Sequence, residues 1–205
     1  MQQTKKAKPT PPTEFQEGDI AAMDAAGLIR ILSNSGSSEF QKAKACMRIG
    51  ELGAKEAVPA LVALLDDEHL SVYARYGLEP IPDSSADEAL RGALSRLKGE
   101  RLIGVINSLG KRRDEKARPA LSKMLYDSDD GVARAAAAAL GGIGGTSSAK
   151  ELKAALTKTS GLTRMAVADS ALICAERMLA DGERDEALAL YTDLTAPGIP
   201  KAARL

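Results

Sequence analysis

Pairs of leucines four residues apart recur along the chain at a nearly constant interval. The six pairs are Leu28/Leu32, Leu61/Leu65, Leu90/Leu94, Leu121/Leu125, Leu152/Leu156 and Leu190/Leu194. Two leucines at this spacing lie on one stripe of a helix, which is the pattern of a helix with a single buried face. Because the first members of successive pairs are 33, 29, 31, 31 and 38 residues apart, the pattern predicts an internal repeat of about 30 residues.

A glycine or a proline precedes most of these pairs at a matching distance. Gly53 and Gly144 each follow an apolar residue that lies nine positions before the next pair, and Pro82 has the same place before Leu90. Gly110 follows an apolar residue that lies twelve positions before its pair, so that turn is three residues longer. Glycine is the usual left-handed C-cap of a helix, and proline also stops a helix. Each repeat is therefore predicted to contain a first helix, a stop, a short turn and a second helix with the leucine pair. We call these helices A and B.

The starts of the helices also have sequence signals. The motifs Ser85-x-x-Glu88 and Ser148-x-x-Glu151 are predicted capping boxes in front of B helices. Pro59 and Pro119 suit the first turn of a helix, where the missing N–H has no helical partner. Carboxylates that can cap the following A helices stand in the B-to-A turns, at Asp66-Asp67 and Asp129-Asp130.

The chain divides into a short lead-in and a long repeat array. Residues 1–18 carry three Lys and three Pro with almost no apolar residue, which predicts a flexible lead-in. Residues 19–205 are predicted to form an all-α, right-handed α-α superhelix of about five helical hairpins, with a capping B-like helix at 20–33. The segment 199–205 has the pattern of the first turn of a further A helix, so the chain is expected to be a fragment of a longer protein.

Composition agrees with closely packed helices. The 205 residues include 36 Ala and 25 Leu but only 2 Phe, 4 Tyr and no Trp. Ala and Leu favour helices, and the β-branched and aromatic residues that favour strands are scarce, which argues against an all-β fold. The 28 basic and 28 acidic residues balance, so no overall field attracts nucleic acid or an anionic membrane. A membrane-spanning run of about 18 apolar residues is also missing.

Three segments resemble the HEAT-like repeats named after phycobilisome lyases. They are AKACMRIGELGAKEAVPALVALLDD (43–67), VARAAAAALGGIGG (132–145) and SSAKELKAALTKT (147–159). The resemblance covers residues 40–160 and implies a helical repeat fold, but such repeats serve many unrelated proteins and imply no single activity. The last unit, around residues 173–191, looks more like a tetratricopeptide hairpin with longer helices.

A second resemblance concerns location. The segments 74–99 and 104–114 resemble repeat proteins from planctomycete-like bacteria, which are typically exported and continue into further repeats or other domains. This resemblance implies a bacterial protein with a periplasmic or exported location, provided that the N-terminus is a mature end. A cytoplasmic location is the alternative.

Candidate catalytic groups are few. The only histidine is His69, which follows Glu68 in a predicted turn. Deoxyhypusine hydroxylase is an enzyme that resembles this fold, and it holds two irons with repeated His-Glu pairs. One histidine cannot supply such a site. Cys46 and Cys174 lie among apolar helix residues and are predicted to be buried structural thiols. The glycine-rich run 141–145 lacks the preceding strand and the Lys-Ser/Thr of a phosphate loop, so it is predicted as a helix stop. We therefore expect no catalytic residue, no metal and no cofactor.

The turn Lys111-Arg112-Arg113-Asp114 fills the one lengthened A-to-B connection. Two arginines followed by an aspartate favour an internal ion-pair ladder along the stack. An ordinary solvated loop is one alternative. The other is a site for an anion or an acidic partner, which the forked donors of arginine would suit.

A second candidate surface lies on the B helices, which line the concave face in HEAT arrays. The positions just after the first leucine of a pair point away from the core, and they are Val62, Arg91, Ser122 and Lys153. Neighbouring residues extend them to a mildly basic ridge, for which a solvated face is the other interpretation. The full set of candidate partner-binding residues is Arg91, Lys111, Arg112, Arg113, Lys123, Tyr126 and Lys153.

These features predict a non-catalytic protein-interaction scaffold that binds a protein partner on its concave face. The partner would be another protein or another domain of the same longer chain, and the chain is expected to be monomeric and to bind no nucleic acid. The alternative is a bilin-lyase-like enzyme subunit or an accessory domain of a larger enzyme, because phycobilin lyases are the nearest enzymes by repeat type. Nucleic-acid binding through residues 111–113 is a third hypothesis.

Overall fold

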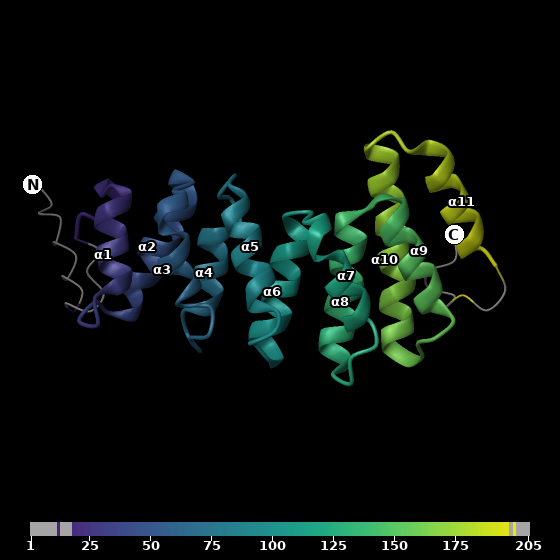
Figure 1. Cartoon of the computed structure of the whole chain (residues 1–205), viewed down its shortest axis with the longest axis horizontal. Coiled ribbons are helices and arrows are strands. Elements are labelled where there is room, and N and C mark those ends of the chain that lie inside the picture. Colours follow the sequence, from purple (N-terminus) through teal and green to yellow (C-terminus); the bar gives the residue numbers. More distant parts are fainter. Residues whose placement is uncertain (1–11, 13–17, 197–198, 200–205) are drawn as a thin grey trace, which may run out of the picture. The chain divides into compact units, whose positions relative to one another are not determined.

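The computed structural model describes residues 12, 18–196 and 199, and every regular element among them is a helix (Figure 1). The prediction of an all-α fold is confirmed. The chain divides into two compact units, residues 1–81 and residues 82–205, and each unit is described by itself. Most of the predicted lead-in at 1–18, and all of the predicted helix start at 199–205 except Ile199, lie outside the described residues.

The first unit begins with the predicted capping element. Its elements are η2 (Ile20–Ala22), α1 (Ala25–Ser33), α2 (Glu39–Leu52), η3 (Lys55–Ala57), α3 (Val58–Val62) and α4 (Ser71–Leu78). The short 3-10 helix η2 and α1 together take the place of the predicted cap helix at 20–33. The A helix α2 packs against both α1 and α4, so it forms the centre of this unit.

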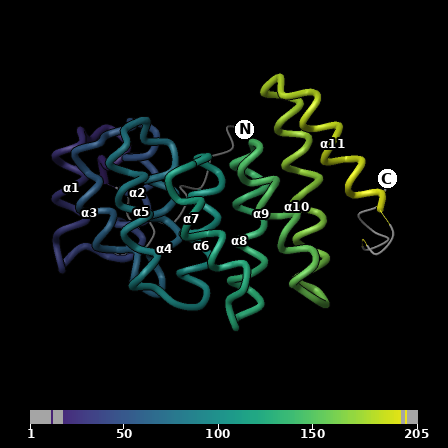
Figure 2. The backbone as a smooth tube through the Cα atoms, turned by 45° about the vertical axis from the view of Figure 1, so that its right-hand side comes forward, coloured from purple at the N-terminus to yellow at the C-terminus, as the bar shows by residue number. Residues whose placement is uncertain are grey.

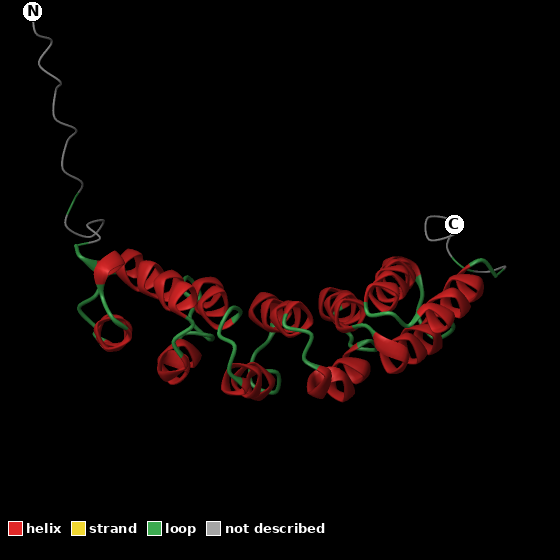
Figure 3. Cartoon of the chain, turned by 90° about the horizontal axis from the view of Figure 1, so that it is seen from above, coloured by secondary structure: helices red, strands yellow, loops and turns green. Residues whose placement is uncertain are grey.

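The second unit is a stack of helical hairpins. Its elements are α5 (Ser84–Ala93), α6 (Gly99–Lys111), η4 (Glu115–Ala117), α7 (Arg118–Met124), α8 (Asp130–Ile143), α9 (Gly145–Leu156), α10 (Gly161–Ala180) and α11 (Arg184–Leu194). The A helices α6, α8 and α10 form one layer, in which α8 packs between the other two (Figure 2). The B helix α7 packs against α8, and α9 packs against α8 and α10, so the B helices form a second row (Figure 3).

The leucine pairs form the core of both units, as predicted. All twelve leucines of the six pairs are buried, and the most accessible of them, Leu94, is only 7% exposed. The A helix α8 instead buries a run of alanines, because it packs closely against α6 on one side and α10 on the other. Burial of every pair confirms the phase of the repeat.

Glycines bring the A helices of the second unit into backbone contact. A Cβ atom on Gly110 of α6 would lie 2.6 Å from the Cα of Ala139 in α8. A Cβ atom on Gly141 of α8 would lie 2.6 Å from the carbonyl oxygen of Ser170 in α10. Any side chain at either position would therefore push the helices apart. The predicted helix stop at Gly110 is wrong, because α6 continues to Lys111 and this glycine serves the contact with α8 instead.

The same kind of contact recurs in the first unit. A Cβ atom on Gly77 of α4 would lie 2.8 Å from the carbonyl oxygen of Cys46 in α2. The small residues that face the preceding A helix are Gly77, Ala139 and Ser170, and their separations are 62 and 31 residues, that is, two repeats and one repeat. The repeat length therefore places a small side chain at each of these helix contacts.

Most of the predicted helix ends are confirmed. Gly53 has a left-handed backbone with a φ of 63° at the C-cap of α2, and Gly144 has a φ of 78° between α8 and α9. The Asp129 carboxylate caps α8 by accepting hydrogen bonds from two backbone N–H groups, at 2.8 and 3.3 Å. The first turns of α3 and α7 contain the predicted prolines, Pro59 and Pro119.

Neither predicted capping box forms. The N-cap of α5 is Asp83, whose carboxylate accepts a hydrogen bond of 2.9 Å from the backbone N–H of Ser85. Ser148 lies inside α9 and is fully buried, because α9 begins at Gly145 directly after α8. A capping box does form at α2, where Ser38 is the N-cap and Gln41 is the third helical residue. Helix α5 therefore begins at the Asp83 cap, before Ser85, and α9 begins at Gly145, before Ser148, so neither serine lies at the start of its helix.

Two glycine-to-alanine substitutions test the close approach of the A helices. Alanine favours a helix over glycine by about 1 kcal/mol, so Gly92→Ala in α5, where a Cβ meets nothing within 4 Å, should stabilise the protein. Gly110→Ala should instead destabilise it by about 1–3 kcal/mol, because its Cβ overlaps the α8 backbone. Urea unfolding measures both free energies. An unchanged or higher stability of Gly110→Ala would show that the contact is not tight.

Candidate interaction surface

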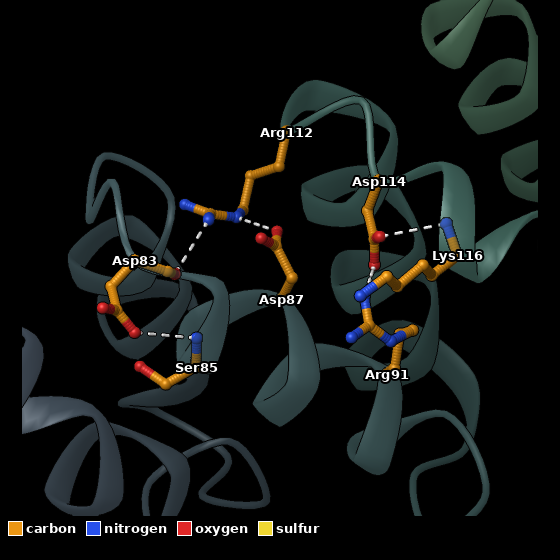
Figure 4. A network of polar contacts seen from close by, with 7 residues as sticks. All are labelled: Asp83, Ser85, Asp87, Arg91, Arg112, Asp114 and Lys116. Carbon is orange, nitrogen blue, oxygen red and sulfur yellow. Dashed lines mark hydrogen bonds and ion pairs between the residues drawn. The ribbon is translucent and has the colours of Figure 1, made fainter.

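Three ion pairs tie the turn that links α6 to α7 to α5 and to the end of α10. Arg112 pairs with Asp87 of α5, Asp114 pairs with Arg91 of α5, and Arg113 pairs with Asp181 at the end of α10. Figure 4 shows the first two pairs side by side, with the turn above α5. The predicted ion-pair ladder is confirmed, and the alternative of an ordinary solvated loop is wrong for these three residues.

Arg112 joins the end of α6 to the start of α5. Its side chain is only 10% exposed, and its Nε donates to the Asp87 carboxylate. Its Nη2 also donates to the carbonyl oxygen of Asp83, at 3.4 Å (Figure 4). The donors of a guanidinium lie in one plane. Contacts with both a carboxylate and a backbone oxygen therefore fix the orientation of the Arg112 side chain as well as pairing its charge.

Asp114 is the carboxylate of the turn, and its side chain is only 6% exposed. One of its oxygens accepts a hydrogen bond from Arg91, and the other accepts one of 3.1 Å from the backbone N–H of Lys116 (Figure 4). The second bond caps η4, so the same carboxylate both starts the B segment and holds α5 beside it. Replacement of Arg91 or of Asp114 alone would leave the other charge unpaired where water has little access.

Arg113 occupies a backbone conformation that normally selects glycine. Its φ is 55°, and it is the only described residue other than glycine with a positive φ. Its side chain explains the choice, since Nε donates to the carbonyl oxygen of Ile143 at 3.3 Å and Nη1 donates to Asp181 at 3.1 Å. Arg113 therefore joins the C-terminal ends of α8 and α10, where a cation is also favoured by the helix dipoles.

The contact between Arg113 and Asp181 also shifts their proton affinities. The hydrogen bond from Arg113 lowers the pKa of the Asp181 carboxyl below its ordinary value. The same hydrogen bond raises the pKa of the Arg113 guanidinium. Both side chains are accessible to water, so this pair is weaker than the two buried ones.

Two further ion pairs connect neighbouring B helices. Arg118 of α7 lies 2.6 Å from Glu151 of α9, and Lys153 of α9 pairs with Asp193 of α11. Together with the pair between Arg91 and Asp114, these contacts fix α5, α7, α9 and α11 in sequence. Ion pairs therefore run along the B helices, and the exposed pair of Lys153 with Asp193 is the weakest of them.

Two grooves open on the outward surface of the B helices. The α5–α7 groove has a volume of about 260 Å³, and it is lined by Arg91, Leu94, Ser95, Lys116, Ala117, Ala120 and Met124. The α9–α11 groove has a volume of about 280 Å³, and its lining includes Ala149, Lys150, Lys153, Met178, Glu186, Ala189, Leu190 and Asp193. Both are smaller than the ~300–1,000 Å³ of most small-molecule sites. Each is large enough for an inserted side chain of a peptide.

The structure distributes the predicted partner-binding residues over this unit. Arg91 lines the α5–α7 groove and Lys153 lines the α9–α11 groove. Lys111 and Lys123 are exposed, and the Tyr126 ring is 48% exposed with the Lys158 ammonium 6.0 Å from its centre. Binding of a partner by these residues stays a prediction. Carboxylates within the chain pair with Arg91, Arg112, Arg113 and Lys153.

Lys116, Ala120 and Met124 of the η4–α7 segment line the α5–α7 groove but are not among the candidate residues predicted from the sequence. They stand four residues apart and therefore share one stripe of the η4–α7 segment. That spacing is a usable signal, but the stripe is short and contains only one strongly apolar residue. The leucine pair of the same helix dominates the pattern.

The cysteines have the predicted structural environment. Cys46 and Cys174 are both fully buried. Burial raises the pKa of the Cys46 thiol to about 12 and that of the Cys174 thiol to about 11, so both are neutral near pH 7. His69 is exposed in the turn before α4. Among the described residues, no group of three or more His, Cys, Asp and Glu is placed to hold a metal ion.

Family models match both units of the chain. Residues 83–172 match HEAT repeats, and residues 43–67 match the PBS lyase HEAT-like repeat. The chain is a HEAT-like repeat protein. Its stacked A and B helices have the α-solenoid architecture of such repeats. No curated protein matches the chain significantly. None of the helices in the described part of this HEAT-like protein is long and apolar enough to cross a bilayer.

Substitutions at Arg113 separate the cost of its backbone from the value of its side chain. Arg113→Gly and Arg113→Ala both remove the guanidinium, but only alanine keeps a side chain in the left-handed conformation. Arg113→Ala should therefore be less stable than Arg113→Gly by about 1 kcal/mol in urea unfolding. The same two changes at Lys111, which is still helical, are the matched control and should give the opposite order. Equal stability of the two Arg113 variants would contradict a strained backbone.

The Asp181 carboxyl provides a pH test of the same contact. Because its folded pKa lies below the value of about 3.9 in unfolded chains, the pair contributes stability above that value. The contribution is lost as the pH falls through the folded pKa. Carbon-detected NMR titration should give a depressed pKa for Asp181 in the unmodified protein and a higher one in Arg113→Gly. An unchanged titration midpoint in the variant would show that Arg113 is not the cause.

Proposed function

We propose that this HEAT-like protein is a non-catalytic scaffold that binds a protein partner on its concave face, the face that the outward surface of the B helices is predicted to form. The observation that carries the proposal is the pair of shallow, mainly apolar grooves on that surface, between α5 and α7 and between α9 and α11. Helical repeat proteins recognise partners along continuous surfaces of this kind. The candidate residues Arg91, Lys123 and Lys153 lie on the same helices.

The ion pairs support this proposal through preorganisation. Arg91 connects α5 to the turn in front of α7, and Arg118 and Lys153 each connect one B helix to the next, so these contacts favour one spacing of the grooves before a partner arrives. A surface that is already ordered loses less conformational entropy on binding. Affinity would then come from a few side chains inserted in the grooves, while the charged residues around them determine orientation.

A bilin-lyase-like enzyme subunit is the second candidate, and the match of residues 43–67 to the PBS lyase HEAT-like repeat favours it. An accessory domain of a larger enzyme belongs to the same class. The buried, neutral thiols of Cys46 and Cys174 give this candidate no reactive sulfur. The visible absorbance of the purified protein separates the two functions, since a bound bilin would colour the preparation.

The setting of the scaffold is part of the proposal. We propose a monomer whose partner is another protein or another domain of a longer chain. An exported bacterial location is proposed on the resemblance of residues 74–99 to planctomycete-type repeat proteins, with the cytoplasm as the alternative. Neutral overall charge speaks for a protein partner rather than nucleic acid.

Site-specific photo-crosslinking tests the proposed surface. A photoreactive amino acid at Lys123, on the B helix α7, should crosslink one recurrent protein in extracts of the source cells. The matched control is Asp169, which is exposed on the A helix α10 and should give no such adduct. The crosslinked protein is then purified and must bind the chain directly. Equal labelling from both positions, or a coloured protein with no adduct, would contradict the scaffold.

A further inference from the structure

The α5–α7 groove combines an apolar floor with a cationic edge. Leu94, Ala117, Ala120 and Met124 supply the floor, and the cations Arg91 and Lys116 also line it. Small alanine side chains leave room above the helix, and the flexible thioether of a methionine adapts to differently shaped side chains. The groove therefore has space for an apolar side chain next to a positive charge.

The charges in this groove are not balanced. Its lining contains two cations and no carboxylate. The nearest acid in the network, Asp114, is 6% exposed and already accepts hydrogen bonds from Arg91 and from the backbone N–H of Lys116 (Figure 4). Within the described part of the chain, no carboxylate pairs with the Lys116 ammonium. An excess of one positive charge is left at the edge of the apolar floor.

The α9–α11 groove shows the contrast. Its cations Lys150 and Lys153 are matched by the acids Glu186 and Asp193, and Lys153 pairs with Asp193 across the groove. A charged partner gains little from such a balanced lining, because it would have to replace an existing pair. The two grooves are therefore predicted to differ in the charge of the ligand that they select.

We infer that the α5–α7 groove binds an acidic, amphipathic peptide segment of a protein partner. An apolar side chain of the peptide lies on Ala117, Ala120 and Met124, and a neighbouring Asp or Glu pairs with Lys116. This inference rests on the proposed function, and it adds the chemistry of the partner at one groove. A nucleic acid is disfavoured here, since two cations neutralise few phosphates and an apolar floor offers them nothing.

Peptide display tests the chemistry without knowledge of the partner. A random-peptide display library is selected on the full chain, and in parallel on Lys116→Glu and on Lys150→Glu. Lys150 is the matched control, because it is exposed, lies on a B helix and lines the balanced groove. Selection on the unmodified chain should enrich peptides in which Asp or Glu stands next to Leu, Met or Phe. The Lys150→Glu variant should enrich the same peptides, and the Lys116→Glu variant should not.

Fluorescence anisotropy of the most enriched peptide then gives the magnitude. Affinity for Lys116→Glu should fall about tenfold, because attraction is replaced by repulsion. Ala120→Asp, which places a charge on the floor, should abolish binding. Lys150→Glu should leave the affinity within about twofold, and added salt should weaken the unmodified complex. Urea unfolding of each variant confirms that the fold is kept.

Three outcomes of the peptide experiments would overturn the inference. Enriched peptides without acidic residues, equal loss in Lys116→Glu and Lys150→Glu, or unchanged binding by Ala120→Asp would each remove the acidic peptide from this groove. None of them would remove the scaffold function, which is decided separately by crosslinking from α7. A single-stranded oligonucleotide that binds and is lost with Lys116→Glu would also overturn the inference, because it would assign the groove to nucleic acid.

Discussion

The close approach of successive A helices is the constraint on which the second unit depends. Gly110 meets Ala139, and Gly141 meets Ser170, at distances that leave no room for a Cβ atom on either glycine. This spacing sets the distance from one hairpin to the next, and the B helices follow because each one packs on the A layer. The width of the α5–α7 groove, and the reach required of each interhelical ion pair, are therefore consequences of small residues in the other layer.

Charged side chains then select one arrangement among those that the packing permits. The pairs of Arg112 with Asp87 and of Arg91 with Asp114 hold the lengthened turn against α5, and Arg113 joins it to the ends of α8 and α10. Arg113 keeps an unfavourable backbone conformation for this purpose. The contacts of the Arg113 side chain explain why a residue other than glycine occupies this left-handed position.

The helical repeat and its core could be predicted because both depend on local periodicity. Leucines four apart identified the buried stripe of every B helix, and all of them are buried. Helix ends were predictable where one residue decides them, as at Gly53 and Asp129. Gly110 and Ser148 were misjudged because their roles depend on a neighbouring helix: the first permits contact with Ala139, and the second is covered inside α9.

The sequence by itself determined the all-α class, the repeat length, the leucine core and the presence of a charged turn at 111–114, since each follows from residue type and spacing along one segment. Only the tertiary structure decided which carboxylate each arginine meets, because Asp87 and Asp181 lie 25 and 68 residues from their partners. The α5–α7 groove is also a feature that only the tertiary structure decided. Its lining combines α5 and the two residues after it with residues of η4 and α7, and its excess of positive charge depends on the pairing of Asp114 with Arg91.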